Sequence, residues 1–109
     1  MEFSEYEEQA TLTAVYPHQG VLPIYPVLGL VGEAGEVAEK VKKLIRDKGS
    51  VLTEPDRELL ILELGDVLWY LSAVSRDIGS SLNEVADANI RKLRQRKLAG
   101  TLQGSGDVR

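Results

Sequence analysis

The 109-residue chain has no cysteine and a single histidine, His18. Without thiols it forms neither a disulfide framework nor a thiolate metal site, and one histidine excludes a multi-histidine site. No stretch approaches the roughly 18 uncharged apolar residues of a membrane span, and the acidic residues 1–5 are the reverse of a basic signal peptide. We therefore expect no membrane partner and a cytoplasmic location, and any bound metal is expected to have oxygen ligands.

The net charge of -4 argues against general nucleic-acid binding, but the charge is unevenly spread. Residues 31–66 contain nine acids and six bases, whereas residues 67–109 carry a net +3. An acidic middle followed by a basic end suits a metal-bound polyphosphate. On composition alone, solvated helix faces are the simpler interpretation.

Apolar residues recur at three- and four-residue steps, which predicts helices and no convincing strand. Four helices are expected: from a Ser4–Glu7 capping box to about Tyr16, from Val27 to Arg46, from a Thr53 cap to Ile78, and from a Ser81–Glu84 capping box to Leu98. The predicted fold is all-α, an antiparallel bundle of about four helices per chain. Residues 1–98 form the expected domain, and residues 99–109 the expected flexible C-terminal tail.

The third predicted helix is apolar on two sides. Leu62, Trp69 and Ala73 fall roughly opposite Leu64 and Leu71 on the helical wheel. One side packs within the chain, and either the fourth helix or another subunit covers the other. We favour another subunit, because helical domains this short commonly gain stability by oligomerising.

Four acidic residues form two matched pairs on neighbouring predicted helices. Glu33 and Glu36 lie at i, i+3 on the second helix, and Glu63 and Asp66 have the same spacing on the third. If the two apolar stripes pack together, the four carboxylates meet along one rim and need a counter-cation. Oxygen ligands alone suit a hard ion such as Mg²⁺.

The spacing by itself also fits an ordinary helix surface, since the same pattern recurs at Glu5–Glu8 and Glu36–Glu39. Two neighbouring features favour a site. Gly29 and Gly32 lie on the flank of the acids, where glycine permits close approach by a ligand or a packed helix. Tyr70 follows Asp66 by one turn, at a place suited to stacking on a base.

The fourth predicted helix carries a candidate phosphate-binding edge. Asn89 lies within its apolar stripe, and Lys92 and Arg96 follow on the same side. An amide, a lysine and an arginine suit phosphate oxygens. Without the acidic rim, a buried amide bonded to the backbone beside two solvated bases would be the preferred interpretation.

Three segments together resemble the MazG-like branch of the all-α nucleoside triphosphate pyrophosphohydrolases. These segments are GLVGEAGEV at 29–37, ELGDVLWY at 63–70 and ANIRKL at 88–93. They reproduce the family's E-x-x-E, spacer, E-x-x-D order, with 26 residues between Glu36 and Glu63, followed by N-x-x-K. The resemblance covers about residues 5–98.

The resemblance implies hydrolysis of a nucleoside triphosphate to the monophosphate and pyrophosphate, with Mg²⁺ or its substitute Mn²⁺. It implies a housekeeping role in the nucleotide pool and assembly as a homodimer or homotetramer. The implied metal ligands are Glu33, Glu36, Glu63 and Asp66, with Glu36 favoured as the general base. The implied substrate-binding residues are Tyr70, Asn89 and Lys92, to which the charge pattern adds Arg96.

Two other functions are compatible with an all-α chain that carries acidic pairs and a basic last helix. A non-catalytic helical adaptor would bind an acidic partner through the basic fourth helix; the presence of all four acids favours the enzyme instead. A di-iron carboxylate bundle requires two E-x-x-H motifs, and the sequence contains none.

Overall fold

The structure is a computed structural model that describes residues 1–100, and the predicted flexible tail falls, from residue 101 onward, outside the described residues. Within the described part, four helices and no strand confirm the all-α prediction. The helices are α1 (Phe3–Thr11), α2 (Ile24–Lys48), α3 (Glu54–Asp77) and α4 (Leu82–Ala99).

The first helix differs from its prediction at both ends. It already includes Phe3, and the Glu5 carboxylate accepts a hydrogen bond from the backbone N–H of Glu2 at 3.3 Å, so the predicted Ser4–Glu7 capping box is wrong. It also ends at Thr11 rather than Tyr16. A residue that precedes proline disfavours helical geometry, and Tyr16 directly precedes Pro17. Residues 12–23 therefore form a connecting segment.

The ends of the other helices follow local chemistry. In α2 the buried Pro26 lies in the first turn, where its missing N–H is tolerated, so the helix begins earlier than predicted. The Thr53 cap of α3 is confirmed as a capping box with Asp56. The Ser81 hydroxyl accepts from the backbone N–H of Glu84 at 3.1 Å and caps α4.

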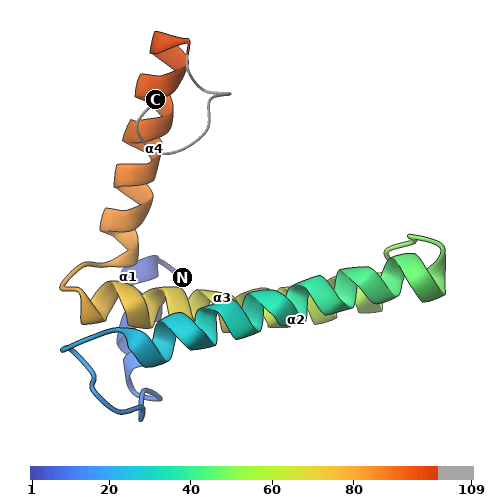
Figure 1. Cartoon of the computed structure of the whole chain (residues 1–109), viewed down its shortest axis with the longest axis horizontal. Coiled ribbons are helices and arrows are strands. Elements are labelled where there is room, and N and C mark those ends of the chain that lie inside the picture. Colours follow the sequence, from blue (N-terminus) through green and yellow to red (C-terminus); the bar gives the residue numbers. More distant parts are fainter. Residues whose placement is uncertain (101–109) are drawn as a thin grey trace.

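The helices α2 and α3 pack antiparallel along their lengths and form a long arm (Figure 1). At the end of the arm opposite the 49–53 turn, α1 contacts α3 and α4. The fourth helix contacts α1 and α3 but, among the described residues, not α2, and it points away from the arm (Figure 1). The four helices therefore do not close into one bundle within a single chain; only α2 and α3 pair along their length.

The chain covers much of the second apolar side of α3 by itself, contrary to the prediction that another subunit does so. Ala73 is 2% exposed, and Trp69 packs against Tyr16 of the connecting segment. Leu62, farther along the same side, stays 67% exposed. No helix among residues 1–100 is long and apolar enough to cross a bilayer.

Candidate functional site

Three of the four predicted metal ligands lie together midway along the arm. Carboxylate oxygens of Glu33 on α2 and of Glu63 and Asp66 on α3 all lie within 4.8 Å of one another. Glu36 is exposed and falls one helical turn beyond Glu33, outside this group. The packing of α2 on α3 thus brings Glu33 to the Glu63 and Asp66 pair and leaves Glu36 outside the group.

The grouped carboxylates repel one another. Burial, and then the charges of Asp66, Glu63 and Glu36, raise the pKa of Glu33 above its ordinary value. Such a group of oxygen donors, whose ionised form is disfavoured without a cation, fits a hard divalent ion such as Mg²⁺ or Mn²⁺. The residues present therefore suit the metal that the sequence predicts.

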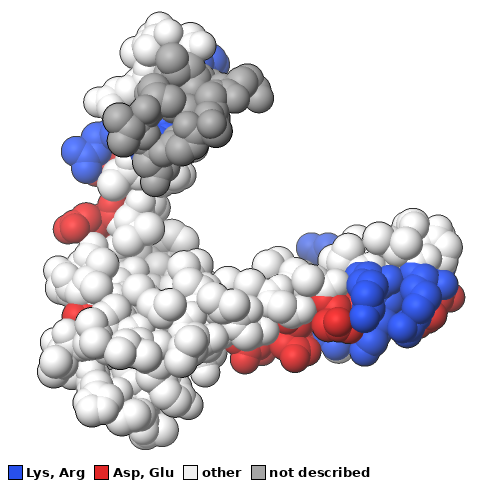
Figure 2. Space-filling model, in the orientation of Figure 1, with Lys and Arg blue, Asp and Glu red and all other residues white. Residues whose placement is uncertain are grey.

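A positive charge from α2 lies at the other edge of the group. The Lys40 ammonium is 3.8 Å from Oε1 of Glu63, and the two side chains are 37% and 20% exposed. Acidic side chains follow the middle of the arm, and basic ones gather toward its 49–53 turn (Figure 2). The arm is therefore electrostatically polarised along its length.

A recess opens beside the carboxylates. Its volume is about 320 Å³, and it is lined by Glu33 and Asp66 together with Thr13, Trp69 and Tyr70. A neighbouring recess of about 210 Å³ shares Thr13, Trp69 and Tyr70 and extends to Tyr16 and Tyr25. The first recess thus combines carboxylate oxygens with aromatic surfaces.

Gly29 allows Tyr70 to reach its place in the wall. A Cβ at Gly29 would overlap the Tyr70 ring, whereas one at Gly32 or Gly35 would meet nothing within 4 Å. The first of the three glycines is therefore explained by close packing against an aromatic ring. Burial, followed by Tyr25 and the charges of Glu33 and Asp66, raises the pKa of Tyr70, so its hydroxyl stays protonated.

The other aromatic residues of this region were not predicted as site residues. The rings of Tyr16 and Tyr25 stack at 5.4 Å, and Trp69 meets Tyr16 and Tyr70 edge-on at 6.2 and 5.0 Å. The Trp69 indole N–H donates to the Thr13 hydroxyl at 2.8 Å. The only signal in the sequence is that Tyr16 and Tyr25 flank a proline-rich segment, which does not reveal their partners.

A buried polar network holds that segment against the end of α3. The Asp77 carboxylate accepts from the Tyr16 hydroxyl at 2.8 Å and from the Gly20 N–H at 3.0 Å. The Arg76 guanidinium donates to the Tyr16 hydroxyl and to the Thr11 hydroxyl, both at 2.9 Å. Hydrogen bonds between residues 57 to 65 positions apart in sequence thereby hold the segment that contributes Thr13 and Tyr16 to the recesses.

The predicted phosphate-binding residues of α4 are not brought to the acidic group within one chain. Asn89, Lys92 and Arg96 lie on the helix that points away from the arm (Figure 1). Asp66 lies eleven residues before the end of α3, about 16 Å along its axis. Asn89 is exposed, contrary to its predicted place in a buried stripe.

Comparison with known proteins supports the family resemblance. A family model for the MazG nucleotide pyrophosphohydrolase domain matches residues 26–99. The chain is also 45% identical, over 109 residues, to the gene 37 protein of Mycobacterium phage L5, covering 95% of this chain and 96% of that protein. No solved structure is significantly similar to the chain.

Proposed function

The chain belongs to the MazG nucleotide pyrophosphohydrolase domain family, and from this premise we propose that it is a Mg²⁺-dependent nucleoside triphosphate pyrophosphohydrolase. The proposed reaction splits a ribo- or deoxyribonucleoside triphosphate into the monophosphate and pyrophosphate, as a housekeeping step in the nucleotide pool. One observation carries the proposal: the same recess is lined by the carboxylates of Glu33 and Asp66 and by the aromatic rings of Trp69 and Tyr70.

Different residues of the recess would bind different parts of the substrate. Tyr70 and Trp69 offer faces and edges on which a base stacks. Glu33, Glu63 and Asp66 would hold Mg²⁺. Glu36, which lies outside this group, would at most add a weak contact to the ion. Bound there, Mg²⁺ supplies positive charge that offsets the developing charge on the phosphates and acidifies water.

We assign the general base to Glu36. It lies one turn from Glu33, is exposed to solvent, and stands outside the three-carboxylate group. A carboxylate in this position is able to orient a water and accept its proton as the water attacks the α-phosphorus. The α–β anhydride bond breaks, and its electron pair leaves with pyrophosphate.

The site is proposed to be completed by a second copy of the chain, as a homodimer or homotetramer. One chain exposes 7870 Å², whereas a compact monomer of its mass exposes about 6000 Å². Its radius of gyration is 16.7 Å, against about 13 Å for a compact chain of this length. The α4 helix of one copy would then bring Asn89, Lys92 and Arg96 to the carboxylates of the other.

The test is a panel of ribo-, deoxyribo- and modified nucleoside triphosphates incubated with Mg²⁺, with the products separated by chromatography. We expect monophosphate and pyrophosphate, and a Glu36→Gln variant with most of the turnover lost but Mg²⁺ binding largely kept. Diphosphate and orthophosphate as primary products would contradict the proposal, because they require cleavage at the γ-phosphate.

One observation favours the alternative function of a non-catalytic adaptor. The α4 helix projects from the arm and carries Arg91, Lys92, Arg94 and Lys97, which suit an acidic partner, whereas Arg96 on the same helix is 5% exposed. A chain with no turnover on the whole panel and no Mg²⁺ binding would leave this alternative in its place.

A further inference from the structure

The contacts between α2 and α3 show the order in which aromatic, acidic and basic side chains follow one another along the arm. Tyr70 lies over Gly29, Glu33 groups with Asp66 and Glu63, and Lys40 pairs with Glu63. Nearer the turn, Lys48 pairs with Asp56 at 2.6 Å. From the open end inward, the surface therefore presents aromatic rings, then carboxylates, then a lysine.

The distances along this order match an extended nucleotide. Seven residues of α3 separate Tyr70 from Glu63, which is about 10 Å along the helix axis. With its base against Tyr70 and its α-phosphate beside the carboxylates, a triphosphate has its β- and γ-phosphates directed toward Lys40. The end of the substrate that leaves as pyrophosphate thus approaches a positive charge.

Lys40 is suited to exchange its partner. At 3.8 Å and with both side chains partly exposed, its ion pair with Glu63 is weak. A divalent cation that engages Glu63 competes with the ammonium group for the same carboxylate. Beside it, the aliphatic stem of Lys40 lines a small gap with Leu44, Leu59 and Leu60, which keeps the stem on the arm.

We propose that Lys40 binds the β- and γ-phosphates of the substrate and the pyrophosphate product, when a metal ion held by Glu63 would leave its ammonium group available. This inference rests on the proposed function. It adds to the site a phosphate-binding lysine from α2, which the sequence motifs do not mark.

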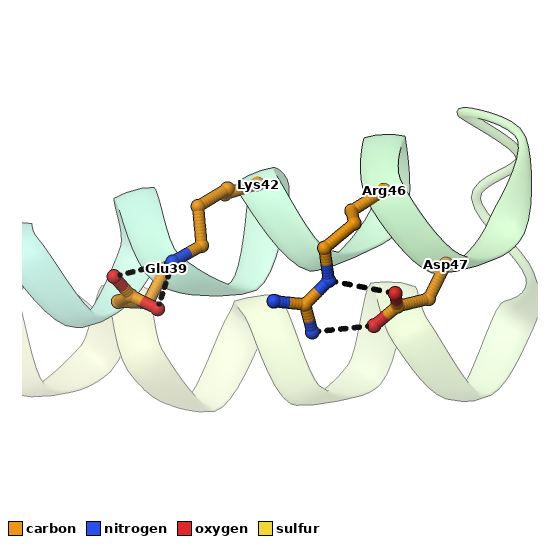
Figure 3. Close-up of polar contacts among 4 residues, drawn as sticks. All are labelled: Glu39, Lys42, Arg46 and Asp47. Atoms are coloured by element: carbon orange, nitrogen blue, oxygen red, sulfur yellow. Dashed lines mark hydrogen bonds and ion pairs between the residues drawn. The ribbon is translucent and has the colours of Figure 1, made fainter.

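The same helix offers a matched control. Lys42 pairs with Glu39, two carboxylate contacts of 2.9 and 3.0 Å, and Arg46 pairs with Asp47 (Figure 3). Glu39 is not one of the grouped carboxylates, and its pKa is lowered mainly by the hydrogen bond from Lys42. Lys42→Met therefore removes the same charge from α2 without touching the grouped carboxylates.

The experiment is calorimetry on the full chain with Mg²⁺ alone, then with inorganic pyrophosphate and Mg²⁺, then with a nucleoside monophosphate and Mg²⁺. For Lys40→Met we expect pyrophosphate binding to weaken about tenfold, since a charged hydrogen-bonding group is lost. Mg²⁺ should bind as tightly or more tightly, because a like charge has gone, and the monophosphate should bind as in the wild type. Lys42→Met should leave all three unchanged, and Lys40→Arg should restore most of the pyrophosphate affinity.

Unchanged pyrophosphate binding in Lys40→Met, or no pyrophosphate binding by the wild type with Mg²⁺, would overturn the assignment of Lys40. So would an equal loss of Mg²⁺, monophosphate and pyrophosphate binding, because Lys40 would then only support the carboxylates. A wild type that binds pyrophosphate through Lys40 but hydrolyses no triphosphate would refute the proposed function and keep Lys40 as an anion-binding residue.

Discussion

At the scale of single residues, the carboxylates of Glu33, Glu63 and Asp66 suit a metal ion. Because they repel one another, they also destabilise the metal-free fold. Their mutual repulsion at the effective dielectric of a protein surface is about 4 kcal/mol for two charges 4 Å apart. The raised pKa of Glu33 has the same origin, after burial. A cation that binds the folded state relieves this repulsion.

We therefore expect Mg²⁺ at about 100 times its dissociation constant to stabilise the wild type by about 2.7 kcal/mol. Asp66→Asn should lose most of that increment and most activity, yet be equally or more stable without metal, because one like charge is gone. Thermal unfolding of both proteins with Mg²⁺ and with chelator measures the difference. If Asp66 were an ordinary surface acid, Asp66→Asn would slightly lower the stability of the metal-free protein and would leave the stabilisation by Mg²⁺ unaltered.

Asp56 takes part in the cap of α3 and also pairs with Lys48 of α2. Hydrogen bonds, first from Lys48 and then from Thr53, lower the pKa of Asp56 to about 2. The pKa of an aspartate in the unfolded chain is about 3.9, so the ionised Asp56 carboxylate stabilises the fold above that pH. The contribution disappears as the pH falls from about 4 toward 2.

Asp56→Asn should accordingly lower the free energy of unfolding at neutral pH and flatten its decline between about pH 4 and pH 2. Denaturant unfolding across this pH range is the measurement. Asp87→Asn is the control, because Asp87 makes an exposed i, i+4 pair with Arg91 at 3.3 Å. If the free energies of unfolding of wild type and Asp56→Asn changed in parallel with pH, the Lys48 contact would add nothing to stability.

At the scale of the helices, the three glycines of α2 differ in what they do. Only Gly29 faces a ring, so Gly29→Ala forces Tyr70 or α2 to move, whereas Gly32→Ala meets open space. Alanine also favours a helix by about 0.8–1 kcal/mol over glycine, so Gly32→Ala should leave stability unchanged or raise it.

We expect Gly29→Ala to lower the melting temperature and to raise the Michaelis constant for the nucleotide, because Tyr70 lines the recess. Thermal unfolding and steady-state kinetics of the two alanine variants give the comparison. If both behave alike, the close contact between Gly29 and Tyr70 does not shape the recess.

At the scale of the whole molecule, the core within residues 1–100 is small. Its buried apolar side chains are Ala10, Tyr16, Pro26, Ala73 and Leu82, while Leu62 and Leu64 on α3 are 67% and 54% exposed. A second copy would cover such surface. We expect a dimer or larger species at micromolar concentration by light scattering, and a lower mass for Leu62→Glu.

The sharing of α4 between copies is tested by mixing two inactive or weakened variants. Glu33→Gln removes a carboxylate of the arm, and Lys92→Ala removes a phosphate contact on α4 and should mainly weaken substrate binding. If each site joins the arm of one chain to the α4 of the other, a mixed dimer has one site with neither change, and activity returns on mixing. Activity no greater than the sum of the separate variants would place both residues in one chain's site.

The sequence by itself determined the helices and the acids. Apolar periodicity and caps such as Thr53 act within a few residues, so three of the four helices were predicted to within about three residues at each end. The i, i+3 spacing likewise places Glu33 and Glu36, or Glu63 and Asp66, on one helix flank. The end of α1 was missed, because Pro17 disfavours helical geometry only at Tyr16, while Thr13 and Tyr16 make tertiary contacts with Trp69 and Asp77 that the sequence does not reveal.

Only the tertiary structure decided which of these residues meet. The antiparallel register of α2 and α3 puts Lys40 beside Glu63 and leaves Glu36 outside the group, and no local pattern encodes that register. The Asp77 network folds residues 12–23 over Trp69, so that Thr13 and Tyr16 line the recess. The physical reason is that local hydrogen bonds and side-chain periodicity are properties of neighbours in sequence, whereas these contacts join residues separated by 23 to 61 positions and depend on how whole helices pack.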